Sequence, residues 1–560
     1  MPYTDPVRKP IAREHYEVII IGGGINGVAI ARECARAGKR TLLLEQHDFA
    51  AGTTSRATRI IHGGLRYLEH GELGLVRESL LERERLLKER PHLVHPKDFV
   101  LAIPKGYGRR SALAIRFGLW LYTSYAHRSH RRSARSSSDV SALEASLDQG
   151  LDLNIFSYED AQCEFPERLT AEWLMEAMQA GAVARNYSKV LEIMVLEGKA
   201  HGVVARDLLT GEETAITSDW VINASGPWAD EVLRASSIHE KRLIGGVRGS
   251  HIVLPTFPGA PHSALYSQGI DGRPIFLIPW AGQLLLGTTE VAQDETPGDT
   301  TPSRAEIQYL FLSLRRLFPN GGLRWSDLQY AYAGVRPLPY QEPKPGKFNL
   351  GSISRRHKLH DHLEDGVAGL ITLVGGKLTT AAKVGRECAR AIGARVADPA
   401  STLVALGEAN GFESTLVEWS RMASQLAHIS PASAAAIAEW HGRYALGIAQ
   451  LAAANPVFRP TLCPHTPHIV AEAVEAVRYE CALSLADILL RRVPVALGAC
   501  WSEECTRTAA HRIGAALGWP EVRVSMEIED FEAERGRFLC RIPDREPSGK
   551  QEPLMLERTV

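Results

Sequence analysis

The N-terminal part of this chain contains the pattern that most constrains its fold. Residues 16–21 form a short, β-branched apolar run ended by glycine, which predicts a buried strand. Apolar positions at helical spacing over 25–37, followed by Gly38, predict a helix, and residues 40–45 predict a second buried strand. A strand, a helix and a strand in this order form a βαβ unit with parallel strands and a right-handed crossover. We therefore expect a Rossmann-type α/β sheet.

Three glycines at the first turn of this unit predict a dinucleotide site. Residues 22–27 fit Gly-x-Gly-x-x-Gly between a strand and a helix, the context that the motif requires. Gly22 permits the tight turn, Gly24 lets the backbone approach a pyrophosphate, and Gly27 lets the helix pack closely on the sheet. The helix N-terminus then presents free N–H groups to the phosphates. Glu45 ends the second strand, where a carboxylate can accept hydrogen bonds from a ribose diol.

Two later segments favour FAD over NAD, between which the glycine motif alone does not choose. Residues 219–226 predict a strand that enters a turn of small residues, and residues 370–380 predict a strand, a double glycine and a helix start. A single mononucleotide-binding half accounts for one strand-and-turn segment of this kind. An extended FAD can contact all three segments, namely the glycine motif and these two. Taken alone, either later segment is an ordinary strand and turn.

Composition excludes several classes of protein. The length of 560 residues predicts two to four structural units. The 64 basic and 65 acidic residues give a formal charge of −1, so the overall electrostatic field does not favour binding of nucleic acid. No run approaches the roughly 18 apolar residues that a spanning helix needs. Residues 1–15 are polar and lack the apolar core of a signal peptide. We expect a protein on the cytoplasmic side, free or attached to a membrane surface.

The cysteines predict neither a disulfide framework nor a metal site. None of the eight lies in a Cys-x-x-Cys pair, and five follow residue 460, a pattern that suits a reducing compartment. His465 and His468 lie near Cys463, but no further ligand pair at tight spacing accompanies them. We therefore expect no metal.

Eight short motifs follow one another along the chain from residue 16 onward. They are residues 22–27, 54–68, 223–228, 249–253, 278–280, 287–290, 334–338 and 375–380, and the most specific part is the Ile-His-Gly-Gly-Leu-Arg-Tyr segment at 61–67. In these motifs and in their order the sequence resembles the FAD-dependent (quinone-linked, aerobic-type) glycerol-3-phosphate dehydrogenases, and the resemblance covers nearly the whole chain. Arg59 and Arg248 stand where the family often has lysine, and Glu290 replaces an aspartate.

The resemblance implies a FAD-binding fold of the D-amino-acid-oxidase-like kind with an interleaved antiparallel substrate domain, and an all-helical C-terminal domain. Alanine-rich helical patterns at 434–454 and 471–492 agree with that helical domain. The expected parts are an arm at 1–15, the FAD-binding and substrate domain at 16–395 (FAD segments about 16–75, 180–235 and 350–395), helices at 407–545 and a flexible tail at 546–560.

The activity that the resemblance implies is the oxidation of sn-glycerol 3-phosphate to dihydroxyacetone phosphate. The C2 hydride goes to N5 of a non-covalent FAD, and the electrons pass to a membrane quinone. A glycerol-3-phosphate oxidase that uses O₂ and a dinucleotide-binding regulator without turnover are the alternatives. The expected cofactor-binding residues are Gly22, Gly24, Asn26, Gly27, Glu45, Thr54, Ser55, Ala224, Gly226, Gly376, Lys377, Leu378 and Thr379.

The substrate carries a phosphate and a hydroxyl, and each needs its own side chains. Arginine offers paired donors that fit phosphate oxygens, and by family position the pocket is built by Arg66, Tyr67, Arg336 and Arg355. Proton removal needs a group near neutral pKa or cations that stabilise the alkoxide. The hypothesis is that His62 is the general base or orients the substrate, while Lys377 and Arg336 polarise the reacting oxygen. The other nineteen histidines receive no role.

A basic segment predicts membrane attachment. Residues 115–122 are mainly aromatic and apolar, with Trp120 and Tyr122 placed to lie at headgroup level. Arginines lie within and around this stretch at 109, 110, 116, 128, 131, 132 and 135. Such a segment suits an anionic lipid surface, although a core helix with solvated ends has the same pattern. The family's membrane quinone favours peripheral attachment to the inner face of the cytoplasmic membrane. The oligomeric state, a homodimer included, stays open.

Overall fold

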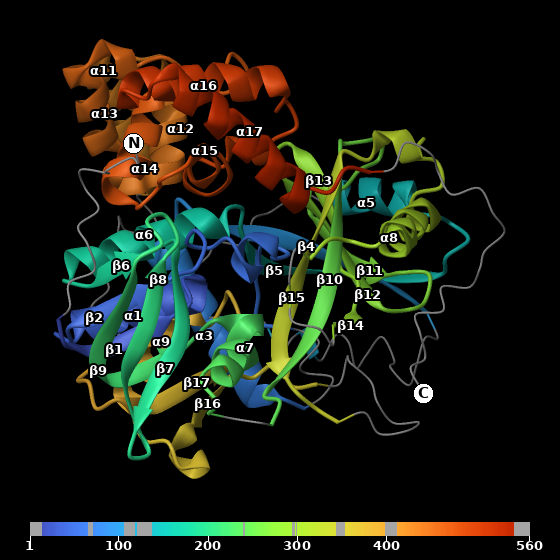
Figure 1. The fold of residues 1–560 in the computed structure, drawn as a ribbon. Helices are drawn as coiled ribbons and strands as arrows, with labels where there is room; N and C mark the ends of the chain where they lie inside the picture. The colour runs from blue at the N-terminus through green and yellow to red at the C-terminus, as the bar shows by residue number, and fades with distance from the viewer. Residues whose placement is uncertain are drawn as a thin grey trace.

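Two mixed sheets lie beneath a group of C-terminal helices (Figure 1). The structure, a computed structural model, describes residues 14–64, 71–105, 118–119, 122, 137–238, 241–293, 297, 300–342, 353–397 and 412–542. The predicted arm and tail, apart from residues 14–15, lie outside the described residues, as does the junction at 398–411.

The first sheet contains the predicted βαβ unit. Its strand order is β16-β17-β9-β1-β2-β6, and β1 lies parallel between β9 and β2. Strands β7 and β8 extend it as an antiparallel ribbon from β9. The bounds are β1 Tyr16–Ile21, β2 Thr41–Leu44, β6 Val183–Arg185, β7 Ser188–Leu196, β8 Lys199–Asp207, β9 Glu213–Asn223, β16 Lys358–Asp361 and β17 Leu370–Val374.

Burial on both faces explains the unbroken apolar run at residues 18–21 of β1. Val18 and Ile20 join the core that contains helix α1 (Ile25–Arg36), whereas Ile19 and Ile21 join the core on the opposite face. Successive side chains point to opposite faces of a strand, so a strand covered on both sides needs apolar residues at every position. Helix α1 packs against α6 (Pro166–Gln179) and α9 (Ala381–Ala391).

The second sheet is mostly antiparallel and is interleaved with the first along the chain. Its order is β14-β10-β13-β12-β11-β4-β5-β3, with β15 paired to β10. The bounds are β3 Ile60–Ile61, β4 Val94–Pro104, β5 Leu153–Cys163, β10 Ile244–Leu254, β11 Ala264–Gln268, β12 Pro274–Trp280, β13 Gln283–Gly287, β14 Val291–Gln293 and β15 Tyr330–Pro339. Helices α3 (Leu73–Glu89), α5 (Ser137–Ser146), α7 (Ala229–Ala235) and α8 (Arg304–Leu317) accompany the sheets. This is the predicted architecture.

The C-terminal part is helical, as predicted, but both long helical patterns are broken. The helices are α11 Phe412–Ala427, α12 Pro431–His441, α13 Ala445–Ala454, α14 Val470–Tyr479, α15 Leu485–Asp487, α16 Glu503–Leu517 and α17 Glu521–Phe538. The 434–454 pattern breaks at Gly442, whose φ of 51° favours glycine. The 471–492 pattern breaks before Ser484, whose side chain accepts a hydrogen bond from the Asp487 N–H and so caps a new helix.

A buried ionic seam joins the helices to the first sheet. We define the seam as Asp48, Arg168, Glu480, Arg491 and Arg492. Arg492 donates to both carboxylate oxygens of Asp48, each at 2.7 Å, and Arg491 pairs with the same carboxylate. Arg168 on α6 pairs with Glu480 at 2.7 Å. The loop after β2 is therefore fixed to the C-terminal helices by compensated charges.

Candidate functional site

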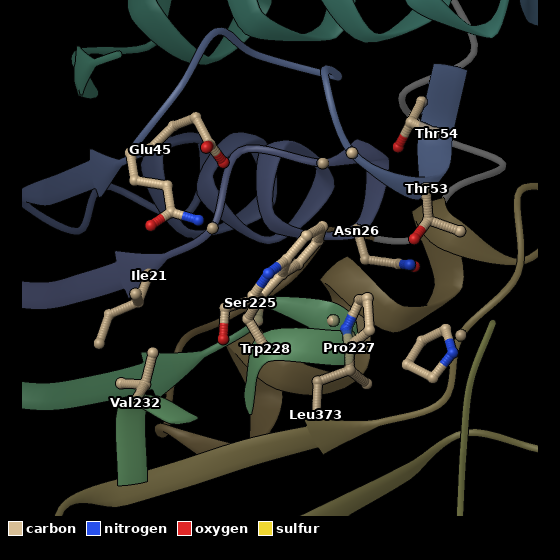
Figure 2. A pocket seen from close by; sticks show the side chains of 18 of the residues that line it. Ile21, Asn26, Glu45, Thr53, Thr54, Ser225, Pro227, Trp228, Val232 and Leu373 are labelled. Carbon is tan, nitrogen blue, oxygen red and sulfur yellow. The ribbon is translucent and has the colours of Figure 1, made fainter. Parts of the chain in front are cut away.

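The glycine motif lies at a cavity of about 330 Å³ where β1, β2, β9 and β17 end (Figure 2). Side chains and backbone from all three predicted FAD-contacting segments line it. The predicted residues among its lining are Gly22, Gly24, Asn26, Glu45, Thr54, Ala224, Gly226, Gly376, Lys377 and Leu378. Segments that lie far apart in the sequence thus meet at one cavity.

Two glycines shape the wall of this cavity. Gly22 has a φ of 105°, and a Cβ placed on it would lie 2.7 Å from the Ala224 carbonyl oxygen. A Cβ on Gly27 would lie 1.8 Å from the carbonyl oxygen of Gly22. Only glycine permits this turn and this close packing of helix on strand.

The residues at the cavity fit a dinucleotide. Asn26 has a buried Oδ1 atom for which the described residues provide no hydrogen-bond partner. Gly24 is the N-cap of α1 and provides no side-chain bond, while Thr54 Oγ1 accepts from the Ile25 N–H at 3.0 Å. An orphaned amide oxygen beside a helix N-terminus suits a ligand that carries both donors and phosphates.

Glu45 stands at the end of β2, where the sequence placed it. Its carboxylate accepts from the backbone N–H groups of Gly23 at 2.6 Å and His47 at 2.8 Å. Burial raises the pKa of Glu45 against the opposing effect of those two bonds. Carboxylate oxygens have further lone pairs, so Glu45 can still accept from ribose hydroxyls.

Three predicted cofactor residues hold the cavity wall without lining it. They are Gly27, described above, Ser55 and Thr379. Ser55 donates its hydroxyl to the Ala50 carbonyl at 2.8 Å, and the Thr379 hydroxyl bonds the backbone of His62. The cavity is also lined by residues that were not predicted from the sequence, which include Thr53, Val190, Ser225, Pro227, Trp228, Val232 and Leu373. Trp228 was detectable, because it ends the quoted 223–228 motif. Val190 comes from the β7 ribbon, for whose position the sequence offers no motif.

His62 and Lys377 lie together beside the cavity. Thr379 Oγ1 accepts from the His62 N–H at 3.2 Å and donates to the His62 carbonyl at 3.4 Å. Burial, followed by the charges of Lys377 and Arg355, lowers the pKa of His62 to about 3. Burial also lowers the pKa of Lys377 to about 7, with Arg355 adding to the shift and Glu78 opposing it. His62 is thus a neutral imidazole at neutral pH and can accept a proton.

The two predicted substrate-binding arginines among the described residues are held on separate elements. Arg336 on β15 donates from Nη2 to Thr288 Oγ1 at 2.9 Å. Arg355 pairs with Glu290 at 2.7 Å, so the carboxylate that replaces the family's aspartate holds an arginine. Arg66 and Tyr67, the other predicted substrate-binding residues, lie outside the described residues.

The side chains at the other two positions that depart from the family pattern both form ion pairs. Arg59 is buried and pairs through both terminal nitrogens with Glu167, each at 3.0 Å. Arg248 pairs with Glu306 at 3.0 Å. Both cations are compensated by a neighbouring carboxylate.

A second imidazole, which the sequence analysis left without a role, lies near Arg336. His251 is buried, its ring stacks on Tyr332 with centroids 4.9 Å apart, and its Nε2 is 2.9 Å from Thr58 Oγ1. Burial, followed by the charges of Arg336 and Arg59, lowers the pKa of His251 to about 3. The 249–253 motif contained this histidine, but one imidazole in an apolar run gave no signal of its own.

The predicted membrane-contact segment lies almost entirely outside the described residues. Tyr122 is described, and it corrects one expectation: the side chain is fully buried, and its hydroxyl donates to Asp160 and accepts from the Gly63 N–H at 2.7 Å. It therefore does not face a lipid surface. Among the described residues, no helix combines the length and apolar character needed to span a membrane.

Known proteins resemble this chain over most of its length. Residues 17–390 match the family model described as FAD dependent oxidoreductase, and residues 375–524 match the C-terminal domain of alpha-glycerophosphate oxidase. A glycerol-3-phosphate dehydrogenase from Synechocystis sp. is 39% identical over 500 residues, 86% of this chain and 89% of that protein. An aerobic glycerol-3-phosphate dehydrogenase from Bacillus subtilis is 33% identical over 378 residues, 67% of this chain and 66% of that protein.

The fold has a solved counterpart. The structure of a glycerol-3-phosphate dehydrogenase from Bacillus halodurans, complexed with FAD, matches with a TM-score of 0.71 at 23% identity. The match covers 94% of this chain and 95% of that chain. The two sheets and the C-terminal helices therefore form one known architecture.

Proposed function

Because the chain belongs to the family of FAD-dependent glycerol-3-phosphate dehydrogenases, we propose that it oxidises sn-glycerol 3-phosphate to dihydroxyacetone phosphate. FAD, when bound, supplies the acceptor for the hydride that leaves C2 of the substrate. The protein's own residues must bind the phosphate, orient the C2 hydroxyl and take its proton.

The observation that carries this proposal is the position of Lys377. Lys377 lines the dinucleotide cavity two residues before Thr379, whose hydroxyl bonds the His62 backbone, and the charge of Lys377 lowers the pKa of His62. A neutral imidazole and an ammonium group are thus placed together beside the cofactor cavity. Binding of a dinucleotide alone does not require an imidazole among several cations, whereas alcohol oxidation does.

The cations of the site support a phosphorylated substrate. Arg336 and Arg355 offer planar guanidinium groups that fit phosphate oxygens, and Arg66 joins them by its place in the family motif. The partners of the two described arginines, Thr288 and Glu290, hold the guanidinium groups in place. We assign the phosphate to these arginines.

The proton of the C2 hydroxyl goes to His62 in this proposal. The cations that lower the pKa of His62 in the free enzyme also attract the substrate phosphate. Negative charge brought by the substrate then favours the protonated imidazole, so the pKa of His62 rises when substrate binds. His62 is therefore unprotonated before binding and a better base after it, while Lys377 and Arg336 stabilise the developing alkoxide.

Anaerobic titration of the purified holoenzyme tests the function. We expect glycerol 3-phosphate to bleach the visible flavin absorbance with formation of dihydroxyacetone phosphate, and unphosphorylated glycerol at the same concentration to leave it unchanged. His62→Asn and Arg336→Met should slow bleaching, and Arg421→Met, in an exposed pair with Glu418, should not. If glycerol 3-phosphate does not reduce the flavin at any concentration, the chain is a non-catalytic binding protein.

The proposed electron acceptor is a membrane quinone, with O₂ as the alternative. The relatives from Synechocystis and Bacillus subtilis are named dehydrogenases, which supports an acceptor other than O₂. The C-terminal part matches a family that is named after an oxidase, which keeps O₂ as the alternative. Reoxidation of the substrate-reduced enzyme distinguishes them. We expect a short-chain quinone to reoxidise the flavin much faster than air-saturated buffer, with little peroxide; fast reoxidation by O₂ with stoichiometric peroxide would support the oxidase.

We further propose peripheral attachment to an anionic membrane surface through the arginines between residues 109 and 135. Sedimentation with vesicles of mixed neutral and anionic lipid at low salt tests it. Replacement of Arg128, Arg131, Arg132 and Arg135 by glutamine should leave the protein in the supernatant, with flavin content unchanged. Equal sedimentation of both proteins would contradict this attachment.

A further inference from the structure

A group of thiols and an imidazole gathers in the C-terminal helical domain, apart from the cofactor cavity. The ligand atoms of Cys463, His465 and Cys505 all lie within 4.8 Å of one another, and His465 Nδ1 is 3.3 Å from Cys505 Sγ. None of these residues lines the dinucleotide cavity. The sequence predicted no metal here, because Cys505 lies some forty residues after the other two.

The first two ligands come from one closed turn. The flanking residues Thr461 and Ile469 form an antiparallel bridge, and the Leu462 N–H donates to the His468 carbonyl at 2.7 Å. Within the loop, the Thr466 N–H donates to the Cys463 carbonyl at 3.4 Å. This turn holds Cys463 and His465 two positions apart, so that both side chains reach one point.

The third ligand stands in the first turn of α16. The N-cap residue Ser502 accepts from the Cys505 N–H, and Cys505 is nearly fully buried. The positive end of a helix stabilises a thiolate, which is the form of cysteine that binds metals. Cys463 is also fully buried, whereas His465 lies at the surface and leaves the group open to ions from solvent.

A third cysteine, Cys500, lies next to this group. Cys500 Sγ lies 3.8 Å from the His465 carbonyl oxygen, and the Cys500 carbonyl oxygen lies 3.6 Å from Cys505 Sγ. The side chain of Cys500 is exposed and can rotate. A rotation toward Cys505 would complete a set of three sulfurs and one nitrogen.

We propose that Cys463, His465 and Cys505, with Cys500 as the fourth ligand, bind one Zn²⁺ ion. Zinc prefers tetrahedral sulfur and nitrogen donors with Zn–S bonds of about 2.3 Å, which places neighbouring sulfurs about 3.8 Å apart. The observed group needs only a small contraction to reach that spacing. Four protein ligands leave no open position, so the ion is structural: it ties the 461–469 turn to the start of α16.

Metal analysis of the purified holoenzyme, prepared without chelators, tests the site independently of the flavin reaction. We expect one zinc per chain, and loss of that zinc in Cys463→Ser and in Cys505→Ser. Cys540→Ser, which replaces a free thiol outside the group, is the matched control and should retain the metal. Growth with cobalt should give the wild-type protein the red-region absorption of tetrahedral Co²⁺–thiolate, where oxidised flavin does not absorb.

The cobalt spectrum keeps the proposal falsifiable if a serine variant fails to fold, because it is measured on the wild-type chain. No bound zinc together with no cobalt–thiolate absorption would overturn the site. Zinc content unchanged in soluble Cys505→Ser would overturn the ligand assignment. A disulfide between Cys463 and Cys505, found by alkylation and mass spectrometry of freshly isolated protein, would identify a redox pair in place of a metal site.

Discussion

Two regions of this molecule bury charged side chains, and they treat them in opposite ways. In the seam each buried cation meets a carboxylate: Arg492 holds both oxygens of Asp48, and Arg168 holds Glu480. Burial alone would raise the pKa of Asp48, but Arg492 and Arg491 bring it below the ordinary carboxylate value. The charged forms are therefore the stable ones.

Beside the cofactor cavity, the effect of burial prevails instead. Burial and the neighbouring cations lower the pKa of both Lys377 and His62, so the positive forms are the disfavoured ones. Such a site gains stability when an anion enters it. The comparison indicates that paired charges hold the fold together, and it supports the proposal that positive charges disfavoured by burial mark the place where an anionic substrate binds.

The largest expected effect is on the seam. Asp48→Asn keeps the side-chain shape but leaves Arg492 without its paired carboxylate, and breaking a buried ion pair from one side costs about 3–5 kcal/mol. Urea unfolding followed by circular dichroism measures the loss. Glu418→Gln, in the exposed pair with Arg421, should show no measurable change, and equal stability of the two variants would remove the distinction between seam and surface.

Lys377→Met should have the reverse profile. Loss of the cation removes stabilisation of the developing alkoxide, and we expect kcat/KM to fall about 10²–10³-fold, or roughly 3–4 kcal/mol. Stability should be retained or increased, because burial disfavours the charge that has been removed. Steady-state assays and urea unfolding on the same preparations check both. A variant that is active but unstable would place Lys377 among the structural charges.

Gly27→Ala tests the wall of the cavity. The added methyl would lie 1.8 Å from the Gly22 carbonyl oxygen, so helix α1 must move away from β1, at a cost of about 1–3 kcal/mol. The same movement opens the cavity, so the purified variant should hold less FAD per chain than the wild type. Gly447→Ala, in helix α13, is the control for an added methyl, since its Cβ would meet nothing within 4 Å and its φ is not positive. Full flavin content in Gly27→Ala would contradict this account.

The smallest expected effect is a change with pH. If protonated Lys377 is needed, kcat/KM falls as the pH rises through the pKa of about 7, by at most a factor of ten per pH unit. Lys377→Arg stays protonated throughout this range, so its profile should be flat there at a lower absolute rate. An alkaline limb that persists unchanged in the arginine variant would belong to another group.

The sequence was sufficient for the parts of the fold that local pattern dictates. Strand β1 is apolar at every position from Val18 to Ile21 because both faces are covered there, and Gly22 and Gly27 meet their neighbours too closely for any side chain. Both signals are local. The breaks at Gly442 and Ser484 escaped prediction, because an alanine-rich pattern continues through them and only the observed conformation and capping reveal them.

The site was predictable only where a motif spanned it. The chain brings Val190 to the cavity through the β7 ribbon, and it brings Cys505 to the turn that contains Cys463. Both meetings depend on tertiary packing between elements far apart in sequence, which residue spacing does not encode. The resemblance supplied His62, Arg336 and Lys377 as candidates, and their roles stay a prediction.

The most direct test of the central claim is the rate of anaerobic flavin reduction by glycerol 3-phosphate, followed by stopped-flow absorbance in wild type and Lys377→Met. The account predicts rapid, saturable bleaching in the wild type. In the variant the rate of bleaching should fall by at least about a hundredfold, while the FAD content stays the same. A wild-type flavin that stays oxidised, or a Lys377→Met enzyme that is reduced as fast as the wild type, would contradict it.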